Sequence, residues 1–360
     1  MKQKEQALHI MKEKNIDVMI LTAGENLRYI TNNKLSESER LLLYFLLQDG
    51  TGIYIVPEVE KTKVDLSNTD TILSYKDEDT HTHLLEQLKE KLYTFRNVAV
   101  EFTKMRLFEF YFVQKLFEGD FIDVEEVIGV LRKYKNTEEI KYIQSAVNIL
   151  EESLEATLPY IEIGRKEIEI AAKLECEMRL RQSEGTPFST IVASGYRGAL
   201  PHGRASEKKI EDGDFIVIDF GSIYKGYVGD MTRTVGIGNV TEKQKQTYKV
   251  VQKALQESIG EIAIGKKVAE IDRIARNTIN QAGYGKYFTH RLGHGIGLNP
   301  HESPYISQTD CNVFQEGMTF TIEPGIYVES EFGIRIEDNI VITKNGARNM
   351  MDMTHELILL

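Results

Sequence analysis

Two aspartates, Asp219 and Asp230, stand in a stretch that predicts two strands joined by a Gly-rich hairpin. Asp219 directly follows the apolar residues 215–218, so we expect its carboxylate at the edge of a buried strand, where an unpaired charge is costly. A metal cation is the natural partner for two carboxylates that can face each other. Either aspartate taken alone is equally consistent with a turn residue beside Gly221 or Gly229.

Three further segments place an imidazole or a carboxylate beside glycine or within an apolar run. They are RLGHGIGLNPHESP with His294, FTIEPGIYV with Glu323, and GIRIEDNIVI with Glu337. Neither glutamate has the polar neighbours of a solvated surface residue. Together with the aspartates, these residues form a mainly oxygen-donor set that suits Mn²⁺, Co²⁺ or Zn²⁺, and carboxylates can bridge two such ions roughly 3.5–4 Å apart. The pattern predicts a two-metal hydrolase.

Taken together, these segments resemble the pita-bread metallopeptidases, the family of methionine aminopeptidase, aminopeptidase P, Xaa-Pro dipeptidase (prolidase) and creatinase. The resemblance covers residues 137–360 and includes the separation of the two aspartates, which is eleven residues. It implies two divalent metal ions per chain, with Mn²⁺ expected first and Co²⁺ or Zn²⁺ as alternatives. The implied ligands are Asp219, Asp230, His294, Glu323 and Glu337.

The same resemblance implies roles for three histidines that are not ligands: His202 in ALPHGRAS, His290 in FTHRLGH and His301 in NPHESP. The expected reaction is attack on the scissile carbonyl by a hydroxide that bridges the two metal ions. Glu323 is expected to shuttle the proton as well as to bind metal. His301 and His202 would hydrogen-bond the substrate carbonyl, and His290 would position the prolyl side.

Two more polar residues lie close to these ligands in sequence. Arg335 precedes Glu337 by two residues, on the same face if the segment is a strand, and could orient a carboxylate in the site. A buried salt bridge remains an equal alternative for Arg335. Thr232, two residues after Asp230, is predicted to hydrogen-bond a ligand carboxylate.

The sequence ahead of these candidate site residues predicts a small α/β domain over residues 1–134, because helix-like and strand-like stretches alternate there. The expected helices are residues 2–14, 82–92 and 104–117, and the expected strands are residues 17–21, 39–47, 53–56 and 98–100. This unit resembles the amino-terminal domain of creatinase and of the proline-specific pita-bread peptidases. Methionine aminopeptidase of bacteria lacks such a domain, so the resemblance narrows the choice within the family.

A second domain, residues 135–360, is predicted to carry all the candidate chemistry. Asn136 stands three residues before Glu139, which predicts a capping box and a helix that continues with apolar residues at helical spacing. From about residue 186 the sequence becomes rich in strand patterns and glycine, with helices expected at 242–262 and 268–283. The expected fold class is α/β (α+β), a creatinase-like amino-terminal domain followed by a pita-bread metallopeptidase domain.

Composition narrows the possible partners. The 360 residues carry a net charge of −11, from 44 basic and 55 acidic side chains, which disfavours nucleic acid or an anionic membrane as the main partner. The amino terminus lacks the apolar segment of a signal peptide, and the longest apolar run, residues 41–47, is too short to cross a bilayer. A cytoplasmic protein with two free cysteines is expected, and a homodimer is the expected assembly.

Other motif-like features give little evidence for a function. His355-Glu356 begins like the zinc-protease motif HExxH but lacks its second histidine, and the segment predicts a terminal strand instead. Residues 293–297, GHGIG, lack the spacing of a dinucleotide-binding loop. His81 and His83 lie in a polar stretch typical of a solvated helix start.

We therefore predict a metal-dependent peptidase that hydrolyses the Xaa-Pro bond of proline-containing peptides or dipeptides, as a dipeptidase or an aminopeptidase. One alternative is a non-catalytic pita-bread protein that binds peptides. A creatinase-like amidinohydrolase, which needs no metal, is a second alternative. It is disfavoured because, without a cation, nothing offsets four converging carboxylates.

Overall fold

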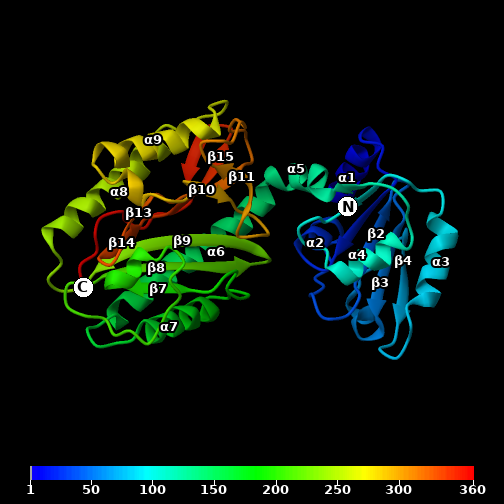
Figure 1. Cartoon of the computed structure of the whole chain (residues 1–360), viewed down its shortest axis with the longest axis horizontal. Coiled ribbons are helices and arrows are strands. Elements are labelled where there is room, and N and C mark those ends of the chain that lie inside the picture. The colour runs from blue at the N-terminus through cyan, green and yellow to red at the C-terminus, as the bar shows by residue number, and fades with distance from the viewer. Residues whose placement is uncertain (1) are drawn as a thin grey trace. The chain divides into compact units, whose positions relative to one another are not determined.

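The computed structural model describes residues 2–360, and the chain divides into two compact units, one ending at Arg132 and the other spanning Lys133–Leu360 (Figure 1). The domain boundary predicted from the sequence lies between residues 134 and 135. Each unit has its own buried apolar clusters. No helix within residues 2–360 combines the length and the apolar character that a membrane crossing requires.

The first unit is a mixed sheet with helices on its faces. Its strand order is β4-β3-β2-β1-β5-β6, in which β1 runs antiparallel to β2 and parallel to β5. The strands are β1 (Val18–Thr22), β2 (Leu43–Leu47), β3 (Gly52–Pro57), β4 (Asp70–Tyr75), β5 (Val98–Val100) and β6 (Phe121–Asp123). The helices are α1 (Lys2–Glu13), α2 (Glu25–Thr31), α3 (Thr82–Leu92), α4 (Leu107–Gln114) and α5 (Ile128–Lys133).

The central strands of this sheet are buried on both faces. In β1, Val18 and Ile20 join one apolar cluster while Met19 and Leu21 join another, because successive side chains of a strand point to opposite faces. Two-sided burial explains why these strands are continuous apolar runs rather than alternating patterns.

The sequence predicted most of these elements. The helix at 82–92 and the strand at 98–100 are confirmed at both ends. The predictions of a strand from residue 39 and of a helix over 104–117 were too long, since β2 begins at Leu43 and α4 spans only Leu107–Gln114. Helices α2 and α5 and strands β4 and β6 were missed. Strand β4 forms one edge of the sheet and β6 the other, and both are only partly buried, so their apolar pattern is weak.

The second unit has four longer helices, α6 (Thr137–Thr157), α7 (Glu167–Leu180), α8 (Glu242–Gly260) and α9 (Val268–Gln281). The predicted capping box at the start of α6 is confirmed. The Asn136 side-chain oxygen accepts hydrogen bonds from the backbone N–H groups of Glu138 (2.9 Å) and Glu139 (3.1 Å), and the Glu139 carboxylate accepts one from the Asn136 N–H (2.7 Å). These bonds satisfy amide groups that a helix otherwise leaves unpaired at its first turn.

Three groups of strands lie between these helices. The sheets are ordered β7-β8-β9, β13-β14 and β11-β10-β12-β15-β16. The strands are β7 (Ile191–Ser194), β8 (Phe215–Tyr224), β9 (Tyr227–Gly236), β10 (Gly293–Gly295), β11 (Glu302–Ile306), β12 (Thr319–Ile322), β13 (Gly325–Val328), β14 (Phe332–Arg335), β15 (Asp338–Thr343) and β16 (Gly346–Asn349). Short 3₁₀ helices complete the chain: η1 (Glu58–Lys63), η2 (Val124–Glu126), η3 (Leu158–Tyr160), η4 (Gly195–Ala199) and η5 (Gly285–Tyr287).

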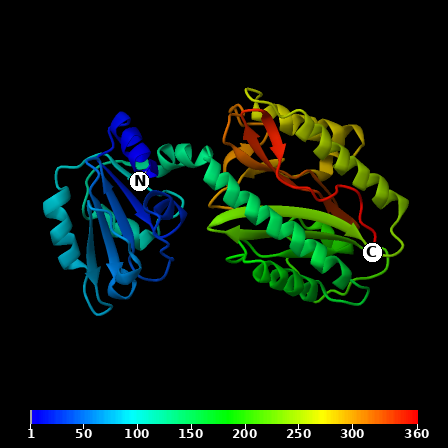
Figure 2. The ribbon, with the colours of Figure 1, turned by 180° about the vertical axis from the view of Figure 1, so that it is seen from behind.

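The four helices form two pairs, α6 with α7 and α8 with α9, and each pair packs against strands. Helix α6 packs along β8 and β9, as the view from behind shows (Figure 2), and its apolar cluster includes residues of α7. Helices α8 and α9 pack against each other and belong to a second cluster with β12 and β14. The strands between these clusters carry the polar residues that the sequence singled out.

Three expectations about local structure are wrong. Asp219 does not end a strand, because β8 continues to Tyr224, and the reversal of the hairpin falls at Lys225 and Gly226, which both have positive φ (47° and 82°). Gly221 and Gly229 lie inside the strands, so the turn-residue alternative for the aspartates is also wrong. The expected terminal strand is replaced by an irregular segment in which Leu359 makes an isolated parallel bridge with Gly236.

Candidate metal and active site

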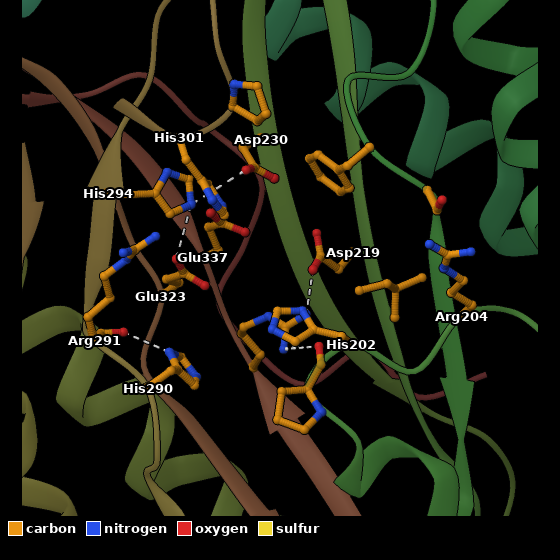
Figure 3. Close-up of a pocket in the computed structure, with 16 residues that line it drawn as sticks. His202, Arg204, Asp219, Asp230, His290, Arg291, His294, His301, Glu323 and Glu337 are labelled. Atoms are coloured by element: carbon orange, nitrogen blue, oxygen red, sulfur yellow. Dashed lines mark hydrogen bonds and ion pairs between the residues drawn. The ribbon is translucent and has the colours of Figure 1, made fainter. Parts of the chain in front are cut away.

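The strands of the second unit bring the five expected metal ligands to one cavity of about 700 Å³. Asp219 lies in β8 and Asp230 in β9, with Gly221 opposite Asp230 in the antiparallel register. His294 lies in β10, Glu323 directly follows β12, and Glu337 lies in the short connection between β14 and β15. Figure 3 shows these side chains converging from opposite walls of the cavity.

The distances within this group are short enough for shared cations. His294 Nε2 lies 3.2 Å from Glu323 Oε1 and 3.8 Å from Asp230 Oδ2. One potential ligand atom from each of Asp230, His294 and Glu337 lies within 4.8 Å of the others. Asp219 stands beside this trio, with its Oδ2 bound to Arg335. The trio and the two flanking carboxylates thus form one continuous polar centre.

Two buried carboxylate oxygens indicate that a cation belongs here. Within residues 2–360, neither Asp230 Oδ1 nor Glu337 Oε1 has a hydrogen-bond partner. Burial, together with the neighbouring charges of the other carboxylates, raises the pKa of Asp230 and of Glu337 well above the usual range. A divalent ion would supply the missing partner and would favour the ionised form of both groups. The residues present therefore fit a divalent metal ion.

The carboxylate of Glu323 differs from its neighbours. Burial acts to raise the pKa of Glu323, but its hydrogen bond with His294 and the charge of that imidazole outweigh burial and lower the pKa to about 2. Glu323 is therefore ionised at neutral pH, and in that form its carboxylate can only accept hydrogen bonds or a proton.

Hydrogen bonds fix the side chains of the expected ligands. The prediction for Thr232 is confirmed, because its hydroxyl donates to Glu337 Oε2 at 2.7 Å. Thr321 accepts a hydrogen bond from the His294 N–H (3.2 Å) and its hydroxyl donates to Glu323 Oε1 (3.4 Å). Thr321 was missed by sequence reasoning, although it lies two residues before Glu323 just as Thr232 lies two residues after Asp230.

Arg335 is buried and combines both roles considered for it. Its guanidinium forms a salt bridge with Asp219, donates to the Tyr327 hydroxyl at 2.6 Å and donates to Thr232 Oγ1 at 3.2 Å. Burial opposes the charged form, but the carboxylates of Asp219 and Glu323 and the hydrogen bond to the Tyr327 hydroxyl overcome it and raise the pKa of Arg335 well above its ordinary value. Arg335 thus stays cationic and fixes the orientation of the Asp219 carboxylate. Tyr327 was missed by sequence reasoning.

His290 is fully engaged by the protein. Its Nδ1 lies 2.7 Å from the Arg291 carbonyl oxygen, which can only accept, so Nδ1 carries the proton in the neutral ring. Its Nε2, 2.9 Å from the Tyr327 hydroxyl, then accepts a hydrogen bond. Burial lowers the pKa of His290, which favours this neutral form. His290 can therefore shape the cavity, whereas it has no proton to spare for a substrate carbonyl.

His301 and His202 differ from His290 because both rings are available. Both line the cavity (Figure 3), and within the described residues no hydrogen bond is formed by either ring. The His301 ring centroid lies 4.0 Å from that of His294. Burial and the charge of His294 lower the pKa of His301 to about 4, so its imidazole is neutral at pH 7 and retains one N–H donor.

Two arginines in the cavity wall were not predicted. Arg204 lies two residues after His202, and Arg291 directly follows His290 (Figure 3). Their place beside two expected histidines was the signal that could have identified them. They add positive charge to a cavity that also holds the buried carboxylates.

Comparison with known proteins identifies the family of this chain. Residues 141–344 match the model of metallopeptidase family M24, and residues 4–134 match that of the creatinase/prolidase N-terminal domain. A Xaa-Pro dipeptidase of Pyrococcus horikoshii is 38% identical over 351 residues, which cover 98% of this chain and 97% of that protein.

Solved structures give the same result for the fold. The crystal structure of a dipeptidase from Pyrococcus horikoshii matches with a TM-score of 0.93 at 36% identity, covering 99% of this chain and 100% of that one. An X-Pro aminopeptidase from Thermotoga maritima matches with a TM-score of 0.87 at 32% identity, covering 99% of both chains. With a creatinase-type domain ahead of a pita-bread domain, the chain belongs to metallopeptidase family M24 and is a metallopeptidase of its Xaa-Pro dipeptidase (prolidase) group.

Proposed function

We propose that this enzyme hydrolyses the bond between an amino-terminal residue and proline, with Xaa-Pro dipeptides as the preferred substrates. The observation that carries the proposal is the pair of buried, unpartnered oxygens, Asp230 Oδ1 and Glu337 Oε1, in a cavity that also holds uncommitted imidazoles. A metal ion at such a centre can activate water and polarise a carbonyl, which hydrolysis requires and peptide binding alone does not. The preference for dipeptides is supported by the similarity to the Pyrococcus horikoshii Xaa-Pro dipeptidase.

We assign metal binding to Asp219, Asp230, His294, Glu323 and Glu337, and the ions to Mn²⁺, with Co²⁺ or Zn²⁺ as alternatives. Divalent ions held by these residues would lower the pKa of a bound water, which makes it a nucleophile at neutral pH, and would polarise the scissile carbonyl. Mn²⁺ is favoured because the set consists of four carboxylates and one imidazole, and carboxylates suit that ion.

The chain's own residues supply the remaining steps. Glu323, ionised and 3.2 Å from His294, takes the proton released by the nucleophile and passes it to the prolyl nitrogen as the bond breaks. The N–H groups of His301 and His202 stabilise the negative charge that develops on the carbonyl oxygen. His290, held by Tyr327 and by the Arg291 carbonyl, forms a fixed wall for the proline ring.

The test is an assay of metal-stripped protein to which Mn²⁺, Co²⁺ or Zn²⁺ is added separately. Each form is given a Xaa-Pro dipeptide, a Xaa-Pro-Yaa tripeptide, and a dipeptide without proline as the matched control. We expect hydrolysis of the Xaa-Pro dipeptide, weaker activity on the tripeptide, and little on the control.

Metal binding measured by calorimetry on the same samples separates the possible failures. Bound metal and bound peptide without hydrolysis under any ion would refute the proposal in favour of a peptide-binding protein. Turnover of creatine by the metal-stripped protein would favour the amidinohydrolase instead. Faster hydrolysis of the tripeptide would assign the enzyme as an aminopeptidase. The homodimer and the cytoplasmic location stay predictions.

A further inference from the structure

A buried carboxylate outside the cavity, that of Glu167, is bonded to both ends of the segment that carries His202. Glu167 begins helix α7 and is fully buried. Its Oε1 accepts hydrogen bonds from the Ser194 N–H (2.7 Å) and hydroxyl (2.9 Å). Its Oε2 accepts from the Ser206 N–H (3.1 Å), the Ser206 hydroxyl (2.6 Å) and Arg197 Nε (3.0 Å). Five donors thus converge on one side chain.

These contacts define a loop, residues 194–206, which we call the His202 loop. Ser194 is the last residue of β7, and Ser206 follows the segment that brings His202 and Arg204 to the cavity. Arg197, bound to Glu167, also donates to the Arg204 carbonyl oxygen at 2.6 Å. One carboxylate therefore fixes the entry, the middle and the exit of the loop.

The His202 loop also contacts the residues of the metal centre. Arg335, which holds Asp219, donates to the Pro201 carbonyl oxygen at 3.2 Å. The backbone of the loop packs directly on β14, since a Cβ added at Gly333 would lie only 1.8 Å from the Gly198 carbonyl oxygen. The loop thus rests on the strand that carries Arg335, and it is also bonded to Glu167 of α7.

The imidazole of His202 is exposed and forms no side-chain hydrogen bond within residues 2–360, so the position of the loop backbone sets the part of the cavity that it can reach. A catalytic group must be held close to its productive position, and a displacement of about 1 Å can cost roughly a hundredfold in rate. Charged hydrogen bonds such as those of Glu167 are stronger than neutral ones and leave a large penalty when one partner is lost.

We propose that Glu167 is a positioning residue for catalysis, which acts by holding the His202 loop against the cavity. The proposal rests on the proposed function, in which His202 stabilises the reacting carbonyl. Glu167 touches neither the metal ligands nor the cavity, so its effect must pass through the loop.

The test compares Glu167→Gln with a matched control, Glu139→Gln. Glu139 is also buried, belongs to the same unit and accepts hydrogen bonds from the Asn136 N–H and the Tyr227 hydroxyl, but has no contact with the loop. In E167Q the side-chain NH2 group replaces one acceptor oxygen, so it must face at least one of the N–H or O–H groups that donate to Glu167. We expect kcat/KM for the Xaa-Pro dipeptide to fall roughly tenfold to a hundredfold, with metal content equal to wild type. E139Q should retain wild-type kcat/KM.

Two readouts separate positioning from a general structural role. In the His202→Ala background, E167Q should cause almost no further loss, because the group that it positions is already absent. Hydrogen exchange of the full chain should rise in peptides covering residues 194–206 in E167Q and stay unchanged there in E139Q. Full additivity with H202A, unchanged exchange in the loop, or kcat/KM within twofold of wild type would each overturn the proposal.

A second variant covers the case in which E167Q does not fold. Arg197 is partly exposed, so Arg197→Met removes the central contact of the loop at a smaller cost in stability, and the same criteria then apply. If the wild-type protein hydrolyses no proline dipeptide, the proposed function fails, yet the exchange experiment still decides whether Glu167 holds the loop.

Discussion

Replacing Thr232 by valine removes one hydroxyl and nearly preserves the shape of the side chain. Thr232 is completely buried, and its hydroxyl donates to Glu337 Oε2 at 2.7 Å while it accepts from Arg335 Nε at 3.2 Å. The variant therefore leaves a ligand carboxylate and a guanidinium each without one partner. Removing a hydrogen bond to a charged group costs about 1.5–3 kcal/mol, which corresponds to roughly tenfold to a hundredfold in an equilibrium constant.

The loss should appear as weaker metal binding, because the hydroxyl orients Glu337 toward the ion. We expect the dissociation constant for Mn²⁺ to rise roughly tenfold to a hundredfold in Thr232→Val. Titration calorimetry of metal-stripped protein, or competition with a chelating dye, measures this directly. At saturating Mn²⁺ the kcat should recover most of its wild-type value, since the group acts on a ligand rather than on the substrate.

The matched control is Thr232→Ser, which keeps the hydroxyl and loses only a methyl group. We expect T232S to bind Mn²⁺ within a few-fold of wild type, even if its stability falls. If T232V also bound Mn²⁺ within twofold of wild type, the hydrogen bond to Glu337 would have no role in holding the metal, and the reasoning from buried partners would be wrong.

Three other predictions concern the site and the fold. His301→Ala should lower kcat roughly a hundredfold and leave metal content unchanged, as measured by steady-state kinetics and elemental analysis; parallel loss of metal would make His301 part of the metal site. Burial and the charge of Asp230 raise the pKa of Glu337, so the metal-free protein should lose stability as pH rises above the ordinary value of 4.5. Glu337→Gln should reduce that loss in urea unfolding while abolishing metal binding, and an unchanged pH slope would contradict the assignment. Asn136→Ala removes the cap of α6 and should lower the free energy of unfolding by about 1 kcal/mol, with the kinetics of the remaining folded enzyme unchanged; an equal stability would show that the cap contributes nothing.

Local patterns in the sequence predicted the elements whose signals are local. The capping box of Asn136 and Glu139 lies within one helical turn, and the helix that begins there follows a clear apolar period. Helix α3 and strand β5 were predicted at both ends for the same reason. The edge strands β4 and β6 were missed because a partly exposed strand has less of the apolar pattern that prediction depends on.

The contacts that organise the site depend on strand register, which the sequence does not display. Thr232 and Glu337 are 105 residues apart, and Arg335 and Asp219 are 116 residues apart. Tyr327 was missed because its hydroxyl gains a role only when β13 and β14 pair and bring it to Arg335. A one-residue shift in any of these pairings would turn the side chains to the opposite face.

Residue type and local spacing were enough to predict the chemistry of a metal centre. Its acids and imidazole appear in order, each beside glycine or an apolar run, and buried carboxylates need a cation wherever the fold brings them together. The tertiary structure decided how each polar group is used: which histidines are free to meet a substrate, which carboxylate Arg335 neutralises, and that Glu167 holds the His202 loop. The physical reason is that side-chain type is a local property, whereas hydrogen-bond partners are set by the packing of strands and helices that are distant in the chain.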